Sequence, residues 1–191
     1  MKRIFLFIVC AISFTVTQAQ LKYGIKAGLN FANLVGPDVD DNGLKLGVHF
    51  GGFANFQVAD KFTVQPELIF SAQGAKFEDP GDDDKYRFSY LNIPLLGQYN
   101  DPSGFYGETG PQFGFLLSAK AKHNGHVSSV NDGYRTVDLS WAFGAGYKVT
   151  PEASVGVRFN LGLSNISDNS HYKVRNSVLQ IGVAYVLGTA K

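Results

Sequence analysis

Alternation of apolar and polar residues is the feature that most constrains the fold of this chain. In a β-strand successive side chains point to opposite faces, so a period of two indicates a strand with one apolar face. The segment 154–164 shows this most clearly. Its apolar positions are Val155, Val157, Phe159, Leu161 and Leu163, and its other positions are Ser154, Gly156, Arg158, Asn160, Gly162 and Ser164. The pattern predicts one strand over this whole segment.

The same alternation recurs along the chain and predicts eight strands. They are expected at 22–34, 46–58, 62–76, 87–99, 105–119, 137–149, 154–164 and 176–187. Strands of this length meet the roughly 9 to 11 residues that a tilted strand needs to cross a membrane. The 22 glycines and 16 phenylalanines against one methionine also favour strands over helices.

The connections between the predicted strands alternate strictly in length. The short ones are 59–61, 100–104 and 150–152, and the long, polar ones are 35–45, 77–86, 120–136 and 165–175. Short periplasmic turns and long extracellular loops are typical of outer-membrane barrels. The predicted fold class is therefore all-β: an eight-stranded antiparallel up-and-down transmembrane β-barrel with both termini in the periplasm.

A soluble lipocalin-like barrel is the structural alternative, because it too is secreted and eight-stranded. Its lumen is apolar and its outside polar. In this sequence the larger apolar side chains share one face, and an eight-stranded lumen has room only for the smaller and polar set. Aromatic residues also gather at the short-turn ends of the strands, as in a membrane-interface girdle. The membrane barrel is therefore preferred.

The first nineteen residues have the three parts of a secretory signal peptide. A positively charged start precedes an apolar run at 4–16, and small residues follow before the expected cleavage site. We therefore predict a signal peptide at 1–19 and an outer-membrane barrel domain at 20–191. Cys10, the only cysteine, lies within the signal, so the mature domain is expected to have no disulfide.

Two consecutive segments carry a family resemblance. Residues 90–99 read Tyr-Leu-Asn-Ile-Pro-Leu-Leu-Gly-Gln-Tyr, and after a tight turn residues 105–110 read Phe-Tyr-Gly-Glu-Thr-Gly. They resemble the PorT-like outer-membrane β-barrel family, which shares a Leu-x-Ile-Pro-Leu-Leu strand and a glycine-rich strand after it. The resemblance covers essentially the whole mature chain. It implies an outer-membrane location and permits an accessory role in protein secretion, because one family component is linked to secretion.

Charged residues also fall on the face that is predicted to line the lumen. They are Lys26, Glu67, Glu108, Lys148 and Arg158, and polar residues on the same face include His49, Asn55, Asn92 and Gln112. An isolated buried charge is very costly, so we expect an ion-pair network. By height above the turns, Glu67 should meet Arg158. Lys26 should lie level with Glu108. Because eight strands leave an interior that side chains just fill, the network is expected to plug the lumen rather than form a pore's selectivity ring.

The first long connection contains a candidate cation-binding loop. Residues 38–43, Asp-Val-Asp-Asp-Asn-Gly, match the opening of a calcium loop, in which Asp38, Asp40 and Asn42 would supply oxygen ligands. The glutamate expected six residues beyond the glycine is absent, and His49 stands there. Weak Ca²⁺ binding is one reading and solvated loop acids the other. The metal is left unknown, and no other cofactor is expected.

No catalytic arrangement is expected. One long connection holds His123, His126, Ser128, Ser129 and Asp132, but no Gly-x-Ser-x-Gly motif accompanies them. A formal charge of +1 without a basic stripe along the sequence argues against nucleic acid. The sequence predicts a non-enzymatic outer-membrane barrel with a structural or surface-interaction role. Its expected partners are outer-membrane lipid, lipopolysaccharide and a surface or secretion-machine protein. The alternatives are an accessory barrel of a secretion machine and a lipid-modifying enzyme.

Overall fold

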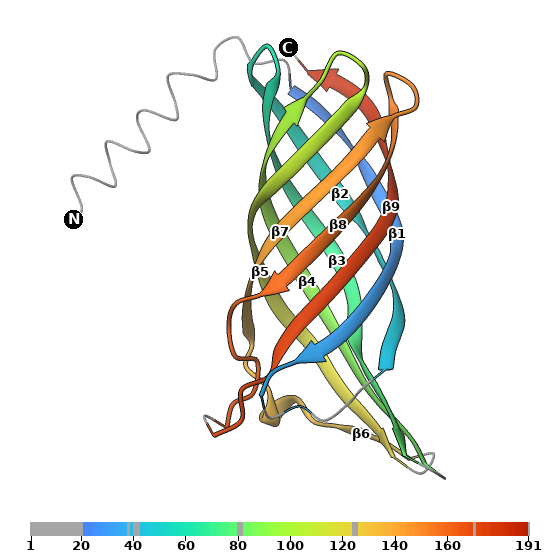
Figure 1. Ribbon diagram of the computed structural model, residues 1–191, viewed down its shortest axis with the longest axis vertical. Helices are drawn as coiled ribbons and strands as arrows, with labels where there is room; N and C mark the ends of the chain where they lie inside the picture. The colour runs from blue at the N-terminus through green and yellow to red at the C-terminus, as the bar shows by residue number, and fades with distance from the viewer. Residues whose placement is uncertain are drawn as a thin grey trace, which may run out of the picture.

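The computed structural model describes residues 21–37, 39, 43–79, 82–123, 126–169 and 171–190. Eight antiparallel strands form a closed barrel (Figure 1). They are β1 (Leu21–Val35), β2 (Gly43–Ala59), β3 (Phe62–Asp79), β4 (Asp82–Asn100), β5 (Phe105–His123), β7 (Val137–Lys148), β8 (Ala153–Gly162) and β9 (Arg175–Ala190). Each barrel strand pairs with the next along the chain, and the pairing of β1 with β9 closes the ring. The predicted eight-stranded up-and-down antiparallel fold is confirmed. No helix among the described residues is long and apolar enough to cross a membrane.

The two ends of the barrel differ. One end, called the turn rim here, carries the tight turns after β2, β4 and β7. The described ends of the chain also meet there, since Leu21 pairs with Ala190 (Figure 1). The opposite end, called the loop rim, carries the connections after β1, β3, β5 and β8. The predicted alternation of short and long connections places them correctly at the two rims.

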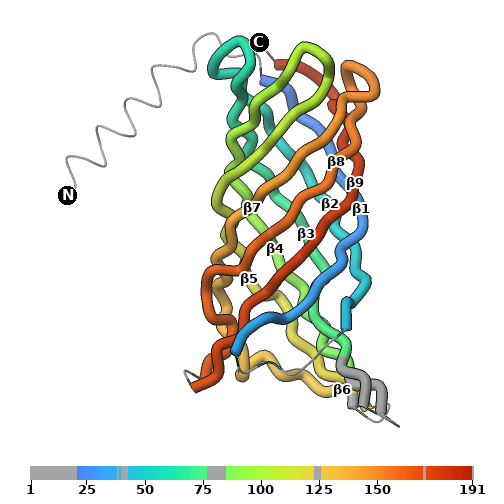
Figure 2. The backbone as a smooth tube through the Cα atoms, viewed as in Figure 1, coloured from blue at the N-terminus to red at the C-terminus, as the bar shows by residue number. Residues whose placement is uncertain are grey.

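Two of the predicted long loops contain β-structure. β3 and β4 continue to Asp79 and Asp82, which pair with each other. β5 continues to His123 and pairs with a short strand, β6 (His126–Ser129), before the 3₁₀ turn η2 (Asn131–Gly133). β3 and β4 reach farther at this rim than β1 and β2 do (Figure 1), and β6 lies across the same rim (Figure 2). The prediction of loops over 77–86 and 120–136 was wrong in extent. The apolar alternation fades there although the backbone pairing continues.

The faces of the strands follow the alternation. Val157 and Phe159 on β8 are exposed on the outside, whereas Arg158 between them and Asn160 after them are buried. An eight-stranded barrel has an interior just wide enough for side chains to fill. The buried polar side chains therefore lie inside the barrel, packed against one another.

The interior is not uniformly polar. Six buried residues at the loop rim form an apolar cluster, called the apolar plug here: Leu34, Ala75, Phe88, Tyr90, Ala119 and Ile166. Ile166 comes from the connection between β8 and β9. Tyr134, just before β7, packs edge-to-face against Phe88, with 4.7 Å between ring centroids. The backbone N–H of Arg135 donates to the carbonyl of Ile166 at 2.8 Å. The expectation of a lumen lined only by small and polar residues was therefore wrong at this end, because the connections fold back over the rim.

A row of four glycines crosses one side of the barrel. Gly28, Gly182, Gly156 and Gly146 stand opposite one another on β1, β9, β8 and β7. Large side chains occupy the space that these glycines leave. A Cβ added to Gly28 would lie 2.7 Å from the ring of His49, and one added to Gly156 would lie 2.7 Å from the Tyr106 hydroxyl.

Candidate functional site

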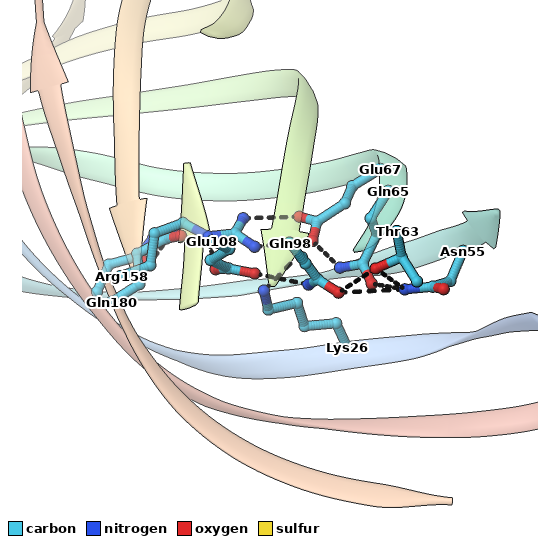
Figure 3. A network of polar contacts seen from close by, with 10 residues as sticks. Lys26, Asn55, Thr63, Gln65, Glu67, Gln98, Glu108, Arg158 and Gln180 are labelled. Carbon is cyan, nitrogen blue, oxygen red and sulfur yellow. Dashed lines mark hydrogen bonds and ion pairs between the residues drawn. The ribbon is translucent and has the colours of Figure 1, made fainter. Parts of the chain in front are cut away.

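Four charged side chains meet inside the barrel in a group called the charge layer here: Lys26, Glu67, Glu108 and Arg158. Arg158 lies at its centre (Figure 3). Its Nη1 and Nη2 donate to the two carboxylate oxygens of Glu67 at 2.7 and 2.8 Å, and its Nε donates to Glu108 Oε1 at 2.7 Å. Lys26 Nζ lies 3.4 Å from Glu67 Oε1. Two cations thus face two carboxylates, so the layer is electrically balanced and the desolvation cost of each charge is offset.

The charge layer draws one residue from every second strand of the ring. Lys26, Glu67, Glu108 and Arg158 come from β1, β3, β5 and β8, and two steps around the barrel separate neighbouring members. β3 and β8 are diametrically opposite. The guanidinium of Arg158 therefore crosses the lumen to reach Glu67.

Side-chain amides complete the hydrogen bonding of both carboxylates. Gln65 Nε2 donates to Glu67 Oε1 at 2.8 Å, and Gln98 Nε2 donates to Glu108 Oε2 at 2.9 Å. Asn55 Nδ2 donates to the oxygens of both glutamines at 2.9 and 3.1 Å (Figure 3). Such a satisfied network is rigid, because each member holds the rotamer of the next.

The structure brings together four of the five residues expected in the lumen network. Lys148 is not among them. It is exposed at the mouth of the turn rim, where β7 ends. Glu67 meets Arg158, as expected from their heights, but the second pairing differs: Lys26 contacts Glu67, and Glu108 binds Arg158. The reason is the narrow lumen, in which one long guanidinium reaches both carboxylates.

A second polar group, the amide layer, lies one step nearer the loop rim and centres on Asn30. Asn30 Nδ2 donates to Ser71 Oγ at 3.0 Å, and Asn30 Oδ1 accepts from Gln180 Nε2 at 3.0 Å. His49 Nδ1 lies 2.8 Å from the same Oδ1. Asn30, Ser71, Gln65, Gln98 and Gln180 were not singled out from the sequence. The signal was available, because they share the inward face of the alternation.

A buried carboxylate lies near the apolar plug. Asp138 on β7 accepts hydrogen bonds from Ser164 Oγ at 2.7 Å and from Asn176 Nδ2 at 2.8 Å. The same Asn176 nitrogen reaches the Tyr90 hydroxyl at 3.3 Å. These contacts tie β7 to β9 and to the start of the connection that follows β8.

Among the described residues, the larger space found in the lumen opens at the turn rim. A cavity of about 250 Å³ opens there, and its inner end is formed by Lys26, Tyr106 and Glu108. Beyond it, the gap beside His49 and Gln180 measures about 10 Å³, no more than one water molecule requires. From the turn rim to the loop rim, the charge layer, the amide layer and the apolar plug follow one another, and β1 contributes Lys26, Asn30 and Leu34 to them in turn.

The family of the chain is decided by its sequence match. Residues 17–168 match the family described as outer membrane protein beta-barrel domain. The chain belongs to this family. The match is to the β-barrel domain as a whole, and not to the PorT-like family in particular. The protein is therefore an outer-membrane barrel, as predicted.

Solved outer-membrane barrels share its fold. Neisserial surface protein A (NspA) is 18% identical with a TM-score of 0.52, over 85% of this chain and 96% of that one. Ail, the attachment invasion locus protein of Yersinia pestis, solved with the heparin analogue sucrose octasulfate, is 16% identical with a TM-score of 0.51, over 88% and 99% of the two chains. No curated protein matches the sequence.

The other candidate sites of this outer-membrane barrel are not assembled among the described residues. Asp38, Asp40 and Asn42 of the candidate cation-binding loop lie outside the described residues, as does the predicted signal peptide at 1–19. Within the described ranges no group of three or more His, Cys, Asp or Glu side chains is arranged to hold a metal ion. In the connection considered for catalysis, His126 and Ser128 lie exposed on β6, and Asp132 lies exposed in η2.

Proposed function

We propose that this protein is a non-enzymatic outer-membrane barrel with a closed lumen, which presents its loop rim at the cell surface. The observation that carries the proposal is the closure of the interior. Arg158 spans the lumen between Glu67 and Glu108, and the apolar plug fills the loop rim. A barrel filled in this way is a rigid anchor for its connections and leaves no path for solutes.

Conductance tests the closure directly. Full-length mature protein, purified in detergent and inserted into planar lipid bilayers, is expected to give negligible current. A large and steady single-channel current from the pure protein would refute the closed-lumen proposal. Unchanged lipid A by mass spectrometry after overexpression is the expected result for the non-enzymatic part.

The orientation has its own test. Short turns and both described chain ends lie at the turn rim, and this arrangement supports a periplasmic turn rim. Single cysteines replace Ser129 on β6 and Ser103 in the turn after β4, two exposed positions at opposite rims. A membrane-impermeant maleimide added to intact cells should label Ser129→Cys and spare Ser103→Cys. The reverse pattern would invert the proposed orientation.

The second candidate is a PorT-like accessory barrel of a secretion machine. It is supported by the sequence of 90–99, which forms most of β4 and leaves Ile93 and Leu95 exposed on the outer face. Such a barrel would remain bound to its partner proteins during purification in detergent. Affinity capture from detergent-solubilised outer membranes, followed by mass spectrometry, separates the two candidates. Stoichiometric secretion components support the accessory role, and a lone barrel supports the self-standing surface protein.

A further inference from the structure

Cationic side chains stand opposite one another on the outer face of the barrel near the loop rim. Lys85 on β4 is paired with Lys76 on β3 and with Lys122 on β5. One row nearer the middle of the barrel, Arg87 on β4 is opposite Lys120 on β5. These residues lie far apart in the sequence, and the strand register gathers them into one band.

The direction of these side chains follows from their neighbours. Phe88 and Ala119 are directly opposite each other and buried in the apolar plug. Arg87 and Lys120, the adjacent pair, therefore point outward, and both are exposed. Lys85 and Lys122 lie two residues further along their strands and share that outer face.

A hollow adjoins this band where β2 and β3 separate. The pairing of β2 with β3 is interrupted between Leu44 and His49. Lys45 occupies the gap, where its Nζ donates to the backbone carbonyl of Gln73 at 2.8 Å. A hollow of about 420 Å³ opens beside it, and its cationic lining is Lys45, Lys76, Lys85 and Arg87. We call it the cationic hollow.

The rest of the lining is apolar. Leu44, Leu46 and Val48 on β2 border the same hollow and are exposed. Leu117 on β5 is exposed too, just below Lys120 on the outer face. On the outer face, the cationic side chains thus border directly on exposed apolar side chains. In a membrane this is the level of the lipid headgroups, where long basic side chains reach for phosphate.

Arg87 and Lys120 are like charges at directly opposed positions, an arrangement that destabilises a sheet unless an anion lies between them. Among the described residues no carboxylate forms an ion pair with Arg87, Lys120 or Lys122. The backbone carbonyl of Gln73 satisfies one donor of Lys45 but carries no full charge. An anion with several oxygens would bridge these cations, and Arg87 offers the planar fork that binds phosphate with two hydrogen bonds.

We infer that the cationic hollow binds the phosphate-bearing headgroup of a membrane lipid, with an acyl chain along Leu44, Leu46 and Val48. The identity of the lipid rests on the proposed orientation, which places the hollow in the outer leaflet and makes the ligand lipopolysaccharide. The phosphates lie against Arg87, which lines the hollow, and against Lys120, which stands opposite Arg87 on the outer face beside it. The apolar side of the hollow fits an acyl chain better than it fits a fully soluble glycan.

The test measures binding of fluorescent lipopolysaccharide to the full barrel in detergent, for wild type and for Arg87→Gln/Lys120→Gln. The variant is expected to bind about tenfold more weakly, and wild type should lose affinity to a similar extent for lipopolysaccharide whose lipid phosphates have been removed. Added salt should weaken binding of the phosphorylated form. The control Lys22→Gln/Lys148→Gln changes charge equally at the turn rim and should bind as wild type does.

A second variant keeps the charges and fills the hollow. Ala72→Leu adds bulk to a residue that lines it and should also weaken binding. Equal affinity of wild type and both variants would overturn the inference, as would equal affinity for phosphorylated and dephosphorylated lipid. Binding of sucrose octasulfate without binding of phosphorylated lipid would overturn it as well. Because the assay uses solubilised protein, it is independent of the conductance and labelling tests of the proposed function.

Discussion

Arg158 and Glu67, 91 residues apart in the chain, join opposite walls of the barrel through two hydrogen bonds of 2.7 and 2.8 Å. The contact does not join neighbouring strands, because β3 and β8 lie on opposite sides of the ring. The pair therefore acts as a strut across the lumen. Glu108 on β5 binds Arg158, and Lys26 on β1 binds Glu67.

Removing the arginine should destabilise the barrel strongly. Arg158→Met leaves Glu67 and Glu108 buried with Lys26 as their only cation, and losing one partner of a buried pair costs roughly 3–5 kcal/mol. The free energy of unfolding in urea, measured for protein folded into lipid vesicles, reports this loss. Lys148→Met, an exposed lysine at the turn rim, should change it by less than about 0.5 kcal/mol. Equal effects of the two substitutions would contradict the central role of Arg158.

Restoring charge balance should recover part of that loss. In Arg158→Met/Glu67→Gln the layer retains Lys26 and Glu108, one cation and one carboxylate. We expect the double variant to be more stable than Arg158→Met alone, with a coupling of roughly 0.5–3 kcal/mol between the two positions. A double-mutant cycle in the same urea assay measures it. Strict additivity would mean that the two side chains do not interact in the membrane.

The glycine row should tolerate no side chain. Gly28→Ala would place a Cβ 2.7 Å from the ring of His49 and against the backbone of β9, at a cost of roughly 1–3 kcal/mol. Gly107 on β5 is the matched control, because a Cβ there would have no atom within 4 Å. Gly107→Ala should leave the unfolding free energy unchanged or slightly higher. The opposite ranking would show that the row is not close-packed.

The apolar plug should contribute stability without controlling conductance. Phe88 is 1% exposed, and Phe88→Ala is expected to cost roughly 3–5 kcal/mol of unfolding free energy. The bilayer current of the variant should stay negligible, because the charge layer still closes the lumen. A current that appears in Phe88→Ala alone would assign the closure to the plug.

Alkaline pH should destabilise the packing of Tyr134 against the apolar plug at the loop rim. Burial, with the neighbouring Tyr86, raises the pKa of Tyr134 to about 12 from 10.0. The folded state therefore favours the neutral phenol, and its contribution to stability is complete below pH ~10 and is lost as the pH rises through about 12. Tyr134→Phe keeps the ring against Phe88 and cannot ionise. Between about pH 8 and about pH 11 the wild type should lose more unfolding free energy than the variant; parallel losses would exclude Tyr134 as the titrating group.

The sequence by itself determined the barrel and the faces of its strands. The period-2 pattern places the side chain of Arg158 on the strand face opposite to Val157 and Phe159. Because lipid surrounds the barrel and the lumen is narrow, only one of the two faces can point inward. The same logic placed Glu67, Glu108 and Lys26 in the lumen. These are local properties, because each depends only on neighbouring residues along one strand.

The Arg158–Glu67 contact was expected from the heights of the two residues above the turns, but tertiary structure decided how the other charged side chains meet. Arg158 reaches Glu67 because ring closure sets β8 opposite β3, whereas Lys148 lies at the mouth because β7 ends there. The apolar plug needs Ile166, which belongs to a connection that folds back over the rim. Lys85 faces Lys122 because the register of β4 and β5 shifts between Ser89 and Tyr90. Closure, connection paths and register shifts depend on the whole barrel, and the alternation along a single strand holds no information about them.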